Sequence, residues 1–276
     1  FAVWCNKSRV LTLGRDRLGE KPLYYGWQGK GEQRVFLFGS EIKSFLKHPG
    51  FSKEINRDAI STFLRNSYIP APHSIYKGIF KLLPGCLLRV SINDQNPIIS
   101  KYWSASKFIN GDKKLIFHSD AEAADKLDHI LQKSVKQQMI ADVPLGAFLS
   151  GGIDSSLIVS MMQSQSLKKI RTFTIGFNQK EFNEANHAKA IASHLQTDHS
   201  ELYIDSSDLL DVIPNLPSIY DEPFADSSQI PTYLISQFAK QDVTVALSGD
   251  GGDELFGGYN RYQITNQYWN KLKHIP

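Results

Sequence analysis

The chain has 276 residues, of which 41% are hydrophobic and 21% charged. This composition is typical of globular proteins and excludes the disordered, collagen-like and coiled-coil classes, and the length favours two domains of about 100–200 residues each. The net charge of +3 is unevenly spread: residues 1–110 carry 17 Lys/Arg against 7 Asp/Glu, and residues 111–276 carry 14 against 21. Because the basic residues are scattered singly, they indicate a solvated surface or a face turned toward an acidic neighbour, and we expect no nucleic-acid partner.

The lengths of the hydrophobic runs and the number of cysteines indicate where in the cell the protein is found. No run approaches the roughly 18–20 apolar residues that a membrane span needs, and the first ten residues lack a basic-then-apolar leader. Only Cys5 and Cys86 are present, too few for a disulfide framework in a chain of this length. We therefore predict a soluble, cytoplasmic protein without a membrane partner.

The first part of the chain reads as short strands and tight turns. Aromatic and β-branched runs, separated by breaks rich in Asn, Gly and Lys, predict antiparallel strands at 1–5, 9–13, 22–27 and 34–39. Two short helices are expected over 39–48 and 56–66, the second with Asn56 as its N-cap. Residues 70–91 then return to loop and strand. We assign residues 1–112 to this first domain.

A domain boundary is expected near residues 110–119. Ser119 precedes Glu122 by three residues, the spacing of a capping box, and predicts a long helix that runs to about Ile140. Strands and helices then alternate: strands are expected at 146–150, 170–177, 199–204 and 243–248, and helices at 155–163, 183–196 and 229–241. This alternation predicts, over residues 113–276, a parallel sheet with helices on both faces. Ligands of such sheets bind beyond the carboxyl ends of the strands.

The first strand of this second domain is followed by the glycine-rich turn SGGIDSS, residues 150–156. Its glycines allow a tight turn, and its N–H groups, hydroxyls and helix N-terminus suit a phosphate. Asp154 would repel a phosphate unless a divalent cation lies between them. The alternative is an ordinary strand-to-helix turn with Asp154 as a cap. The turn matches neither a Walker A loop nor a GxGxxG fingerprint.

A second glycine-rich turn, SGDGGDELFGGY at residues 248–259, follows the last predicted strand. Loops at the carboxyl ends of strands in one parallel sheet converge on one site. Carboxylates from both loops, Asp154 and Asp253, could then hold Mg²⁺ on nucleotide phosphates, because Mg²⁺ is typically bound by one or two carboxylates plus phosphate oxygens. This second loop makes the alternative of a plain turn the weaker one.

These residues match a family. SGGIDSS is similar to the pyrophosphate loop of ATP pyrophosphatases, and with FTIGF, NEANHAKAIASHL and SGDGGDELFGGY it resembles the synthetase domain of glutamine-hydrolysing asparagine synthetases. GRDRLGEKPLYYG, FGSEIKSFLKHPGF and PAPHSIYKGIFKLLPG resemble the closing third of that family's N-terminal glutaminase domain. The resemblance implies an α/β protein: a helix-flanked, parallel-sheet ATP-pyrophosphatase (PP-loop) domain, preceded by a partial antiparallel glutaminase domain of the Ntn-hydrolase type.

The resemblance also implies the roles of individual residues. Leu149 and Ile175 would line the adenine site, although ordinary core packing would be the reading of these two alone. The nucleotide would further contact Ser150, Gly151, Gly152, Asp154, Ser155, Ser156, Ser248 and Gly249. Mg²⁺ would bind Asp154 and Asp253. Asp250 stands where asparagine synthetases proper usually carry Glu, at a position tied to forming the aspartyl-adenylate, so it is the expected catalytic residue.

The implied reaction is amide formation from ATP, a carboxylate and ammonia. The carboxylate attacks the α-phosphorus of MgATP, pyrophosphate leaves, and ammonia derived from glutamine displaces AMP from the acyl-adenylate. Aspartate is the favoured acceptor; the alternatives are another carboxylate, such as a surface-polysaccharide sugar acid, and a noncatalytic ATP-binding relative. The family suggests a homodimer. Phe1 stands where the glutaminase nucleophile Cys would be required, so we expect a fragment that makes no amide from glutamine.

Overall fold

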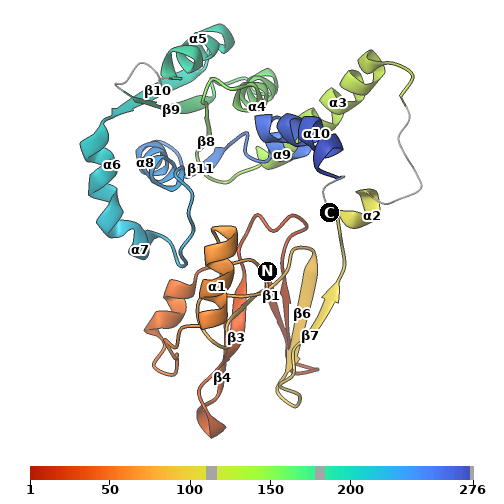
Figure 1. The fold of residues 1–276 in the computed structure, drawn as a ribbon, viewed down its shortest axis with the longest axis vertical. Coiled ribbons are helices and arrows are strands. Elements are labelled where there is room, and N and C mark those ends of the chain that lie inside the picture. The colour runs from red at the N-terminus through yellow and green to blue at the C-terminus, as the bar shows by residue number, and fades with distance from the viewer. Residues whose placement is uncertain (110–116, 178–183, 274–276) are drawn as a thin grey trace. The chain divides into compact units, whose positions relative to one another are not determined.

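The computed structural model describes residues 1–109, 117–177 and 184–273, and its contacts divide the chain into two compact units (Figure 1). Unit 1 comprises residues 1–115 and 214–226, and unit 2 comprises residues 116–213 and 227–276. The sequence range 214–226 was expected in the second domain, yet it packs with unit 1. Most of the expected boundary segment, residues 110–116, lies outside the described residues.

Unit 1 is built on two antiparallel sheets. The four-stranded sheet has the order β1-β2-β6-β7 and the three-stranded sheet the order β4-β3-β5. The strands are β1 (Ala2–Cys5), β2 (Val10–Gly14), β3 (Tyr24–Gln28), β4 (Val35–Gly39), β5 (Phe80–Lys81), β6 (Cys86–Ser91) and β7 (Ile98–Lys101). The helical segments are the 3-10 turns η1 (Gly31–Gln33) and η2 (Ile42–Lys47) and the α-helices α1 (Arg57–Asn66) and α2 (Ser106–Ile109).

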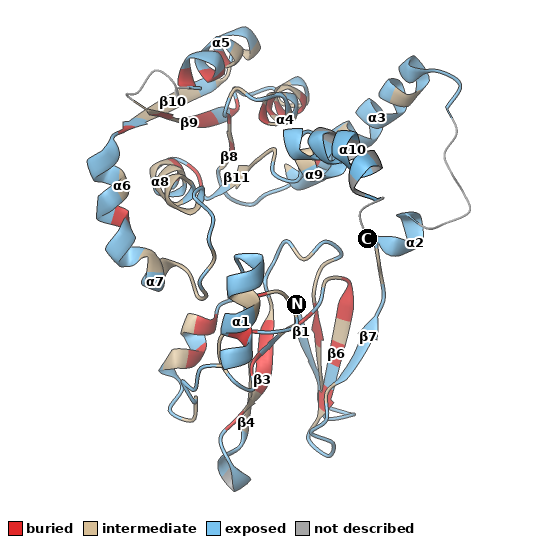
Figure 2. Ribbon diagram, in the orientation of Figure 1, coloured by how far each residue is buried: buried red, intermediate tan, exposed pale blue. Residues whose placement is uncertain are grey.

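Strand alternation distributes the apolar residues of unit 1 over two cores. Tyr25 of β3 packs with Leu13 and Leu88 of the four-stranded sheet, whereas its neighbour Tyr24 packs with Ile42 and other residues on the opposite face. This follows because successive strand residues point to opposite faces. Figure 2 shows buried positions on β3 and β6, whereas β1 and β7 are exposed along their whole length. The expected helix at 39–48 is shorter than predicted and has 3-10 geometry.

The turn between β2 and β3 is organised by Arg15 and Asp16. The Asp16 carboxylate accepts hydrogen bonds from the amides of Gly19, Glu20 and Lys21 at 2.6, 3.0 and 3.0 Å. Arg15 donates to three backbone carbonyls, among them Leu82 O at 2.6 Å. Burial alone would raise the pKa of Asp16, but the backbone amides together bring it below its ordinary value. The motif GRDRLGEK is thus a structural turn in which Arg15 and Asp16 are hydrogen-bonded to the backbone.

Unit 2 has the expected parallel sheet, with the strand order β10-β9-β8-β11. Its strands are β8 (Leu145–Phe148), β9 (Arg171–Phe177), β10 (Asp198–Ile204) and β11 (Val245–Leu247). The helices that pack in this unit are α3 (Asp120–Gln138), α4 (Ile153–Ser164), α5 (Ala185–Leu195), α6 (Ser206–Val212), α8 (Gln229–Ala239), α9 (Gly252–Phe256) and α10 (Asn260–Leu272). Two further short elements, η4 (Ile213–Asn215) and α7 (Leu216–Ile219), begin where the chain passes into unit 1.

Helices cover both faces of this sheet, as the alternating pattern predicts. One core joins Val135 of α3, Met162 of α4 and Ala188 of α5 to Ala147 of β8. A second core joins Phe173 of β9 to Ala239 and Phe238 of α8. The sheet is therefore buried on both sides, which suits a parallel sheet. In the described parts of the chain, no helix combines the length and the apolar composition that a bilayer span requires.

The start of α3 departs slightly from the predicted capping box. Ser119 Oγ accepts a hydrogen bond from the Glu122 amide at 3.2 Å, as expected for an N-cap. The Glu122 carboxylate, however, accepts from the amide of His118 at 2.8 Å. In a reciprocal capping box, the Glu122 carboxylate would accept a hydrogen bond from the Ser119 amide. The expected start of the helix before β10, at Asn183, lies outside the described residues, and the observed helix α5 begins at Ala185.

The largely buried His199 of β10 is expected to make the free energy of unfolding fall at acid pH. Its side chain is only 10% exposed, Nδ1 lies 2.9 Å from Thr172 Oγ1, and Nε2 lies 3.7 Å from Glu201 Oε1 without a hydrogen bond. Burial lowers the pKa of His199, against an upward effect of Glu201. Because the folded-state pKa is lowered, the stabilisation is present above the unfolded pKa of about 6.5 and is lost as the pH falls through the folded pKa.

We expect His199→Gln to flatten the fall of the unfolding free energy between pH 7 and pH 5, by up to about 1.4 kcal/mol per pH unit, the maximum for one proton. Urea unfolding at the two pH values measures this difference. His129→Gln, at an exposed position on α3, is the control and should leave the slope unchanged. An equal slope in wild type and His199→Gln would contradict the prediction.

Candidate nucleotide site

The first glycine-rich loop connects β8 to α4. Leu149 is 1% exposed, and its amide donates to Phe173 O at 2.9 Å, which extends the pairing of β8 with β9 by one residue. The chain then turns at Ser150 and Gly151 and enters α4 at Ile153. Gly151 has φ +84°, and a Cβ there would lie 2.8 Å from the Ala188 amide nitrogen. Only glycine fits this position, because the backbone is left-handed and helix α5 lies directly against it.

The serines of this loop are partly engaged with the loop itself. Ser155 is buried, and its Oγ lies 3.1 Å from the Ser150 amide and 2.9 Å from Ser150 Oγ. Ser156 Oγ donates to Gly152 O at 2.6 Å. Gly152 is the N-cap of α4 and supplies no side-chain acceptor to the first turn. The helix N-terminus thus carries donors that suit an anion.

The second glycine-rich loop follows β11, which pairs in parallel with β8. Both loops therefore leave the same edge of the sheet, as the sequence predicts for neighbouring parallel strands. Close packing joins them: a Cβ on Gly249 would lie 2.6 Å from the Ser155 nitrogen and 2.8 Å from the Asp154 carbonyl carbon. A Cβ on Gly252 would lie 2.5 Å from Asp154 Cγ. The structure thus brings Asp154 directly against the second loop.

The remaining predicted residues lie around these loops. Ser248 Oγ donates to Asp250 Oδ2 at 3.0 Å, and Asp250 is exposed. Asp253 is half-buried in the first turn of α9, and its Oδ1 occupies the place that a Cβ on Gly258 would need. Ile175 is half-buried on β9, two residues beyond the pair formed by Phe173 and Phe148. It therefore lies toward the carboxyl edge from which both loops leave.

Beside the first loop, unit 2 has a hollow of about 520 Å³. Helix α4 contributes Ser156, Leu157 and Ser160 to its lining, and α5 contributes Ile191 and His194. Gly151 and Gly152 border the same hollow. Ser156 therefore borders both the loop and the hollow.

The donor set suits a magnesium nucleotide. Mg²⁺ keeps several waters and uses one or two carboxylates plus phosphate oxygens, and Asp154 and Asp253 are the two carboxylates that the sequence predicts for this role. A Cβ on Gly251 would meet no atom within 4 Å, and this glycine is exposed. Within residues 1–109, 117–177 and 184–273, no cluster of three or more His, Cys, Asp or Glu side chains forms a metal cage. Asp154 and Asp253 would therefore need phosphate oxygens beside them to hold Mg²⁺.

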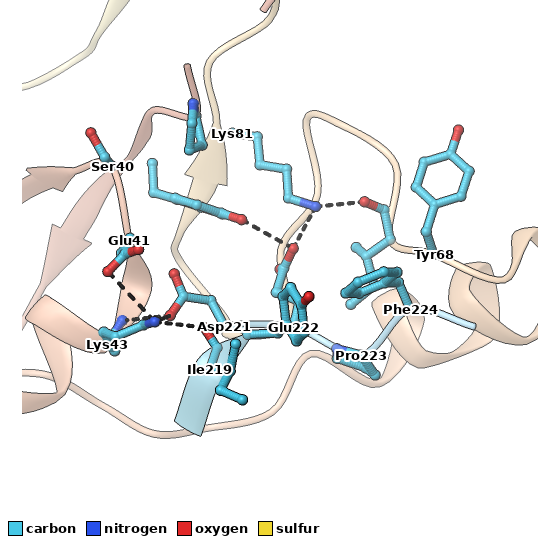
Figure 3. A pocket seen from close by; sticks show the side chains of 14 residues that line it. Ser40, Glu41, Lys43, Tyr68, Lys81, Ile219, Asp221, Glu222, Pro223 and Phe224 are labelled. Carbon is cyan, nitrogen blue, oxygen red and sulfur yellow. Dashed lines mark hydrogen bonds and ion pairs between the residues drawn. The ribbon is translucent and has the colours of Figure 1, made fainter. Parts of the chain in front are cut away.

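The sequence patterns do not reveal that one pair of acidic residues is buried and bound. Asp221 and Glu222, in the segment that joins unit 1, have side chains only 9% exposed. Their sequence context, YDEPF, gives no periodicity that would reveal burial. Only the spatial partners found in residues 40–81 show that these carboxylates are bound (Figure 3).

A parallel, helix-flanked sheet with glycine-rich loops at its carboxyl edge is typical of nucleotide-binding proteins. Two family models narrow this class of proteins to one family. The model of the asparagine synthase family matches residues 126–276, and that of the glutamine amidotransferase domain matches residues 1–103. The chain belongs to the asparagine synthase family. The resemblance seen in its motifs is thereby confirmed, as is the fold class.

Individual relatives agree with this family assignment. A Methanocaldococcus jannaschii protein, provisionally named glutamine-hydrolysing asparagine synthetase 2, is 40% identical over 264 residues, which cover 94% of this chain and 49% of the relative. Glutamine-hydrolysing asparagine synthetase 1 of Bacillus subtilis is 34% identical over 263 residues, covering 95% of this chain and 40% of the relative. This chain therefore spans about half or less of the length of these relatives.

Among solved structures, the glutamine-dependent NAD+ synthetase of Acinetobacter baumannii is 15% identical, with a TM-score of 0.36, and the match covers 67% of this chain and 33% of that one. At this TM-score the likeness is too weak to transfer any property.

Proposed function

We propose that this chain carries the ATP-dependent part of an amide-forming ligase, which activates a carboxylate as an acyl-adenylate and transfers ammonia to it. One observation supports this most strongly: Gly249 and Gly252 of the second loop pack against the backbone and carboxylate of Asp154 in the first loop. Two polar, glycine-rich loops held this closely at the carboxyl edge of a parallel sheet are suited to binding a nucleotide's phosphates.

In the proposed reaction, a carboxylate oxygen attacks the α-phosphorus, the bond to the bridging oxygen breaks, and pyrophosphate leaves. The nitrogen of ammonia then attacks the acyl carbon, the bond from that carbon to the AMP oxygen breaks, AMP leaves, and the nitrogen loses one proton to solvent. The protein's contribution is positioning and charge neutralisation. The Gly152–Asp154 turn and Ser156 would hold the leaving pyrophosphate, and Leu149 and Ile175 would line the adenine. Bound by Asp154 and Asp253, Mg²⁺ would offset the phosphate charge.

Aspartate is the acceptor we propose, with Asp250 as the residue that assists formation of the adenylate. The relatives carry asparagine synthetase names, which supports this choice. Asp250 is one methylene shorter than the Glu usual at this position, which leaves room for a second candidate, amidation of a different carboxylate. Glutamine is the proposed ammonia source. The cytoplasmic location and the homodimer stay predictions.

Exchange of labelled pyrophosphate into ATP tests the proposal in the full-length gene product. Exchange that depends on aspartate supports aspartate adenylation. Exchange that starts only with another carboxylate, for example a sugar acid, supports the second candidate. If ATP binds but no carboxylate starts exchange, the chain is a noncatalytic nucleotide-binding relative and the proposed reaction is wrong.

A further inference from the structure

The segment Pro214–Asp226, here called the strap, packs with residues that precede it by more than a hundred positions. It belongs to unit 1, although the residues on both sides of it, up to Ile213 and from Ser227, belong to unit 2. The strap contains α7 and the sequence YDEPF. It also forms one wall of a hollow of about 290 Å³ in unit 1, which Figure 3 shows.

Glu222 anchors the strap to β5 and to the loop that precedes it. Its Oε1 accepts a hydrogen bond from the Ile75 amide at 2.7 Å. Its Oε2 lies 2.5 Å from Lys81 Nζ, as Figure 3 shows. The Tyr24 hydroxyl lies 3.4 Å from Oε2. The side chains of Glu222 and Lys81 are only 9% and 16% exposed. Loss of the Glu222 carboxylate would leave the largely buried Lys81 without its ion-pair partner. An unpaired buried charge is costly.

Asp221 anchors the strap to η2. Its two oxygens accept hydrogen bonds from the amides of Ile42 and Lys43 at 2.6 and 3.1 Å. The N-cap residue of η2, Glu41, supplies no side-chain cap of its own. Asp221 therefore performs the capping role from a distant part of the sequence. Lys43 Nζ adds a hydrogen bond to Ile219 O at 2.7 Å.

A backbone bond completes the attachment. The Ala225 amide donates to Ser67 O at 2.7 Å, at the C-terminal cap of α1. The strap is thus held at both ends of its YDEPF sequence by donors and acceptors of residues 42–81. Each anchoring carboxylate is nine-tenths buried and meets at least one backbone amide as well as a lysine, unlike a surface ion pair, which contributes little.

We propose that the strap is a coupling element and that Asp221 and Glu222 are its positioning residues. Because both ends of the strap continue covalently into the unit that carries the glycine-rich loops, its docking ties that unit to the amidotransferase unit. This inference rests on the proposed function: a docked strap is required for ammonia released from glutamine to reach the acyl-adenylate, and it is not required for ATP activation itself.

Hydrogen exchange in the 276-residue chain tests the docking. We expect Glu222→Gln and Asp221→Asn to speed exchange of the Ala225 and Ile42 amides about tenfold or more, an opening free energy lower by about 1.4 kcal/mol. Glu54→Gln removes an exposed ion pair with Lys77 in the same unit and should leave both amides unchanged. Lys81→Met combined with Glu222→Gln should restore part of the protection lost in Glu222→Gln, because no unpaired charge remains. Unchanged exchange in both single variants would refute the anchoring role.

The full-length gene product tests the coupling. The ratio of glutamine-supported to ammonium-supported amide formation should fall about tenfold or more in Glu222→Gln, with ammonium-supported AMP formation kept within about twofold. An unchanged ratio together with accelerated exchange would overturn the coupling role while leaving the proposed function intact. Absence of AMP formation in the wild type would instead refute the proposed function, and with it the coupling, whereas the exchange result would still decide whether the carboxylates anchor the strap.

Discussion

Asp154→Asn in the full-length gene product should lower Mg²⁺-dependent AMP formation by at least about 100-fold, the order of effect seen when one preorganised charge-stabilising group is removed. The variant keeps the size of the side chain that packs against Gly252, so the fold should survive. It loses the charge that would bind Mg²⁺. Asp253→Asn should have the same effect, because its carboxylate is the second one proposed for the metal.

The measurement is AMP release at saturating ATP over a range of Mg²⁺ concentrations. Asp125→Asn, at an exposed position on α3, removes a charge from the same unit and should leave the rate unchanged. Circular dichroism establishes that each variant is folded. Undiminished AMP release in both Asp154→Asn and Asp253→Asn would show that neither carboxylate holds the metal.

Gly249→Ala is expected to weaken ATP binding about tenfold or more and to destabilise unit 2. Its Cβ would lie 2.6 Å from the Ser155 nitrogen and 2.8 Å from the Asp154 carbonyl carbon. Both are backbone atoms, which cannot rotate away, so the two loops must separate. Overpacking of this kind costs about 1–3 kcal/mol, and separation of the loops removes the arrangement that would bind phosphate.

Gly251→Ala in the same loop provides the comparison. A Cβ there meets no atom within 4 Å, although φ is +91°, so only the cost of a left-handed backbone applies, about 1–2 kcal/mol. Calorimetric titration with MgATP should therefore show the larger loss of affinity for Gly249→Ala. Equal and small losses in the two variants would mean that contact between the loops is not needed for binding.

The sequence predicts most of unit 2 because its signals are local. Apolar runs alternate with helical spacing, and the Ser119 side chain caps α3 at the predicted position. The pairing of β11 with β8 then brings the two loops to one edge. Because β8 and β11 run in parallel, the loops that follow them leave the same edge of the sheet, so the sequence predicts that these two loops lie together.

Other features could not be predicted because their causes are distant in sequence. Ser155 has the same local pattern as Ser156, but its hydroxyl turns back onto Ser150. The strap has no periodicity, and its acidic pair finds its donors more than 140 residues earlier in the chain. Sequence patterns describe what lies within a few turns of a residue, whereas burial of a carboxylate depends on partners that only the folded chain brings close.

The central claim, adenylation of a carboxylate, is tested most directly by oxygen transfer. The full-length gene product is supplied with MgATP, ammonium and aspartate whose side-chain carboxylate is labelled with ¹⁸O, and the products are analysed by mass spectrometry. Our account predicts asparagine with one equivalent of AMP and one of pyrophosphate, and one ¹⁸O atom in each AMP, because the attacking oxygen leaves with the phosphorus. Unlabelled AMP, or ADP and phosphate in its place, would contradict the account.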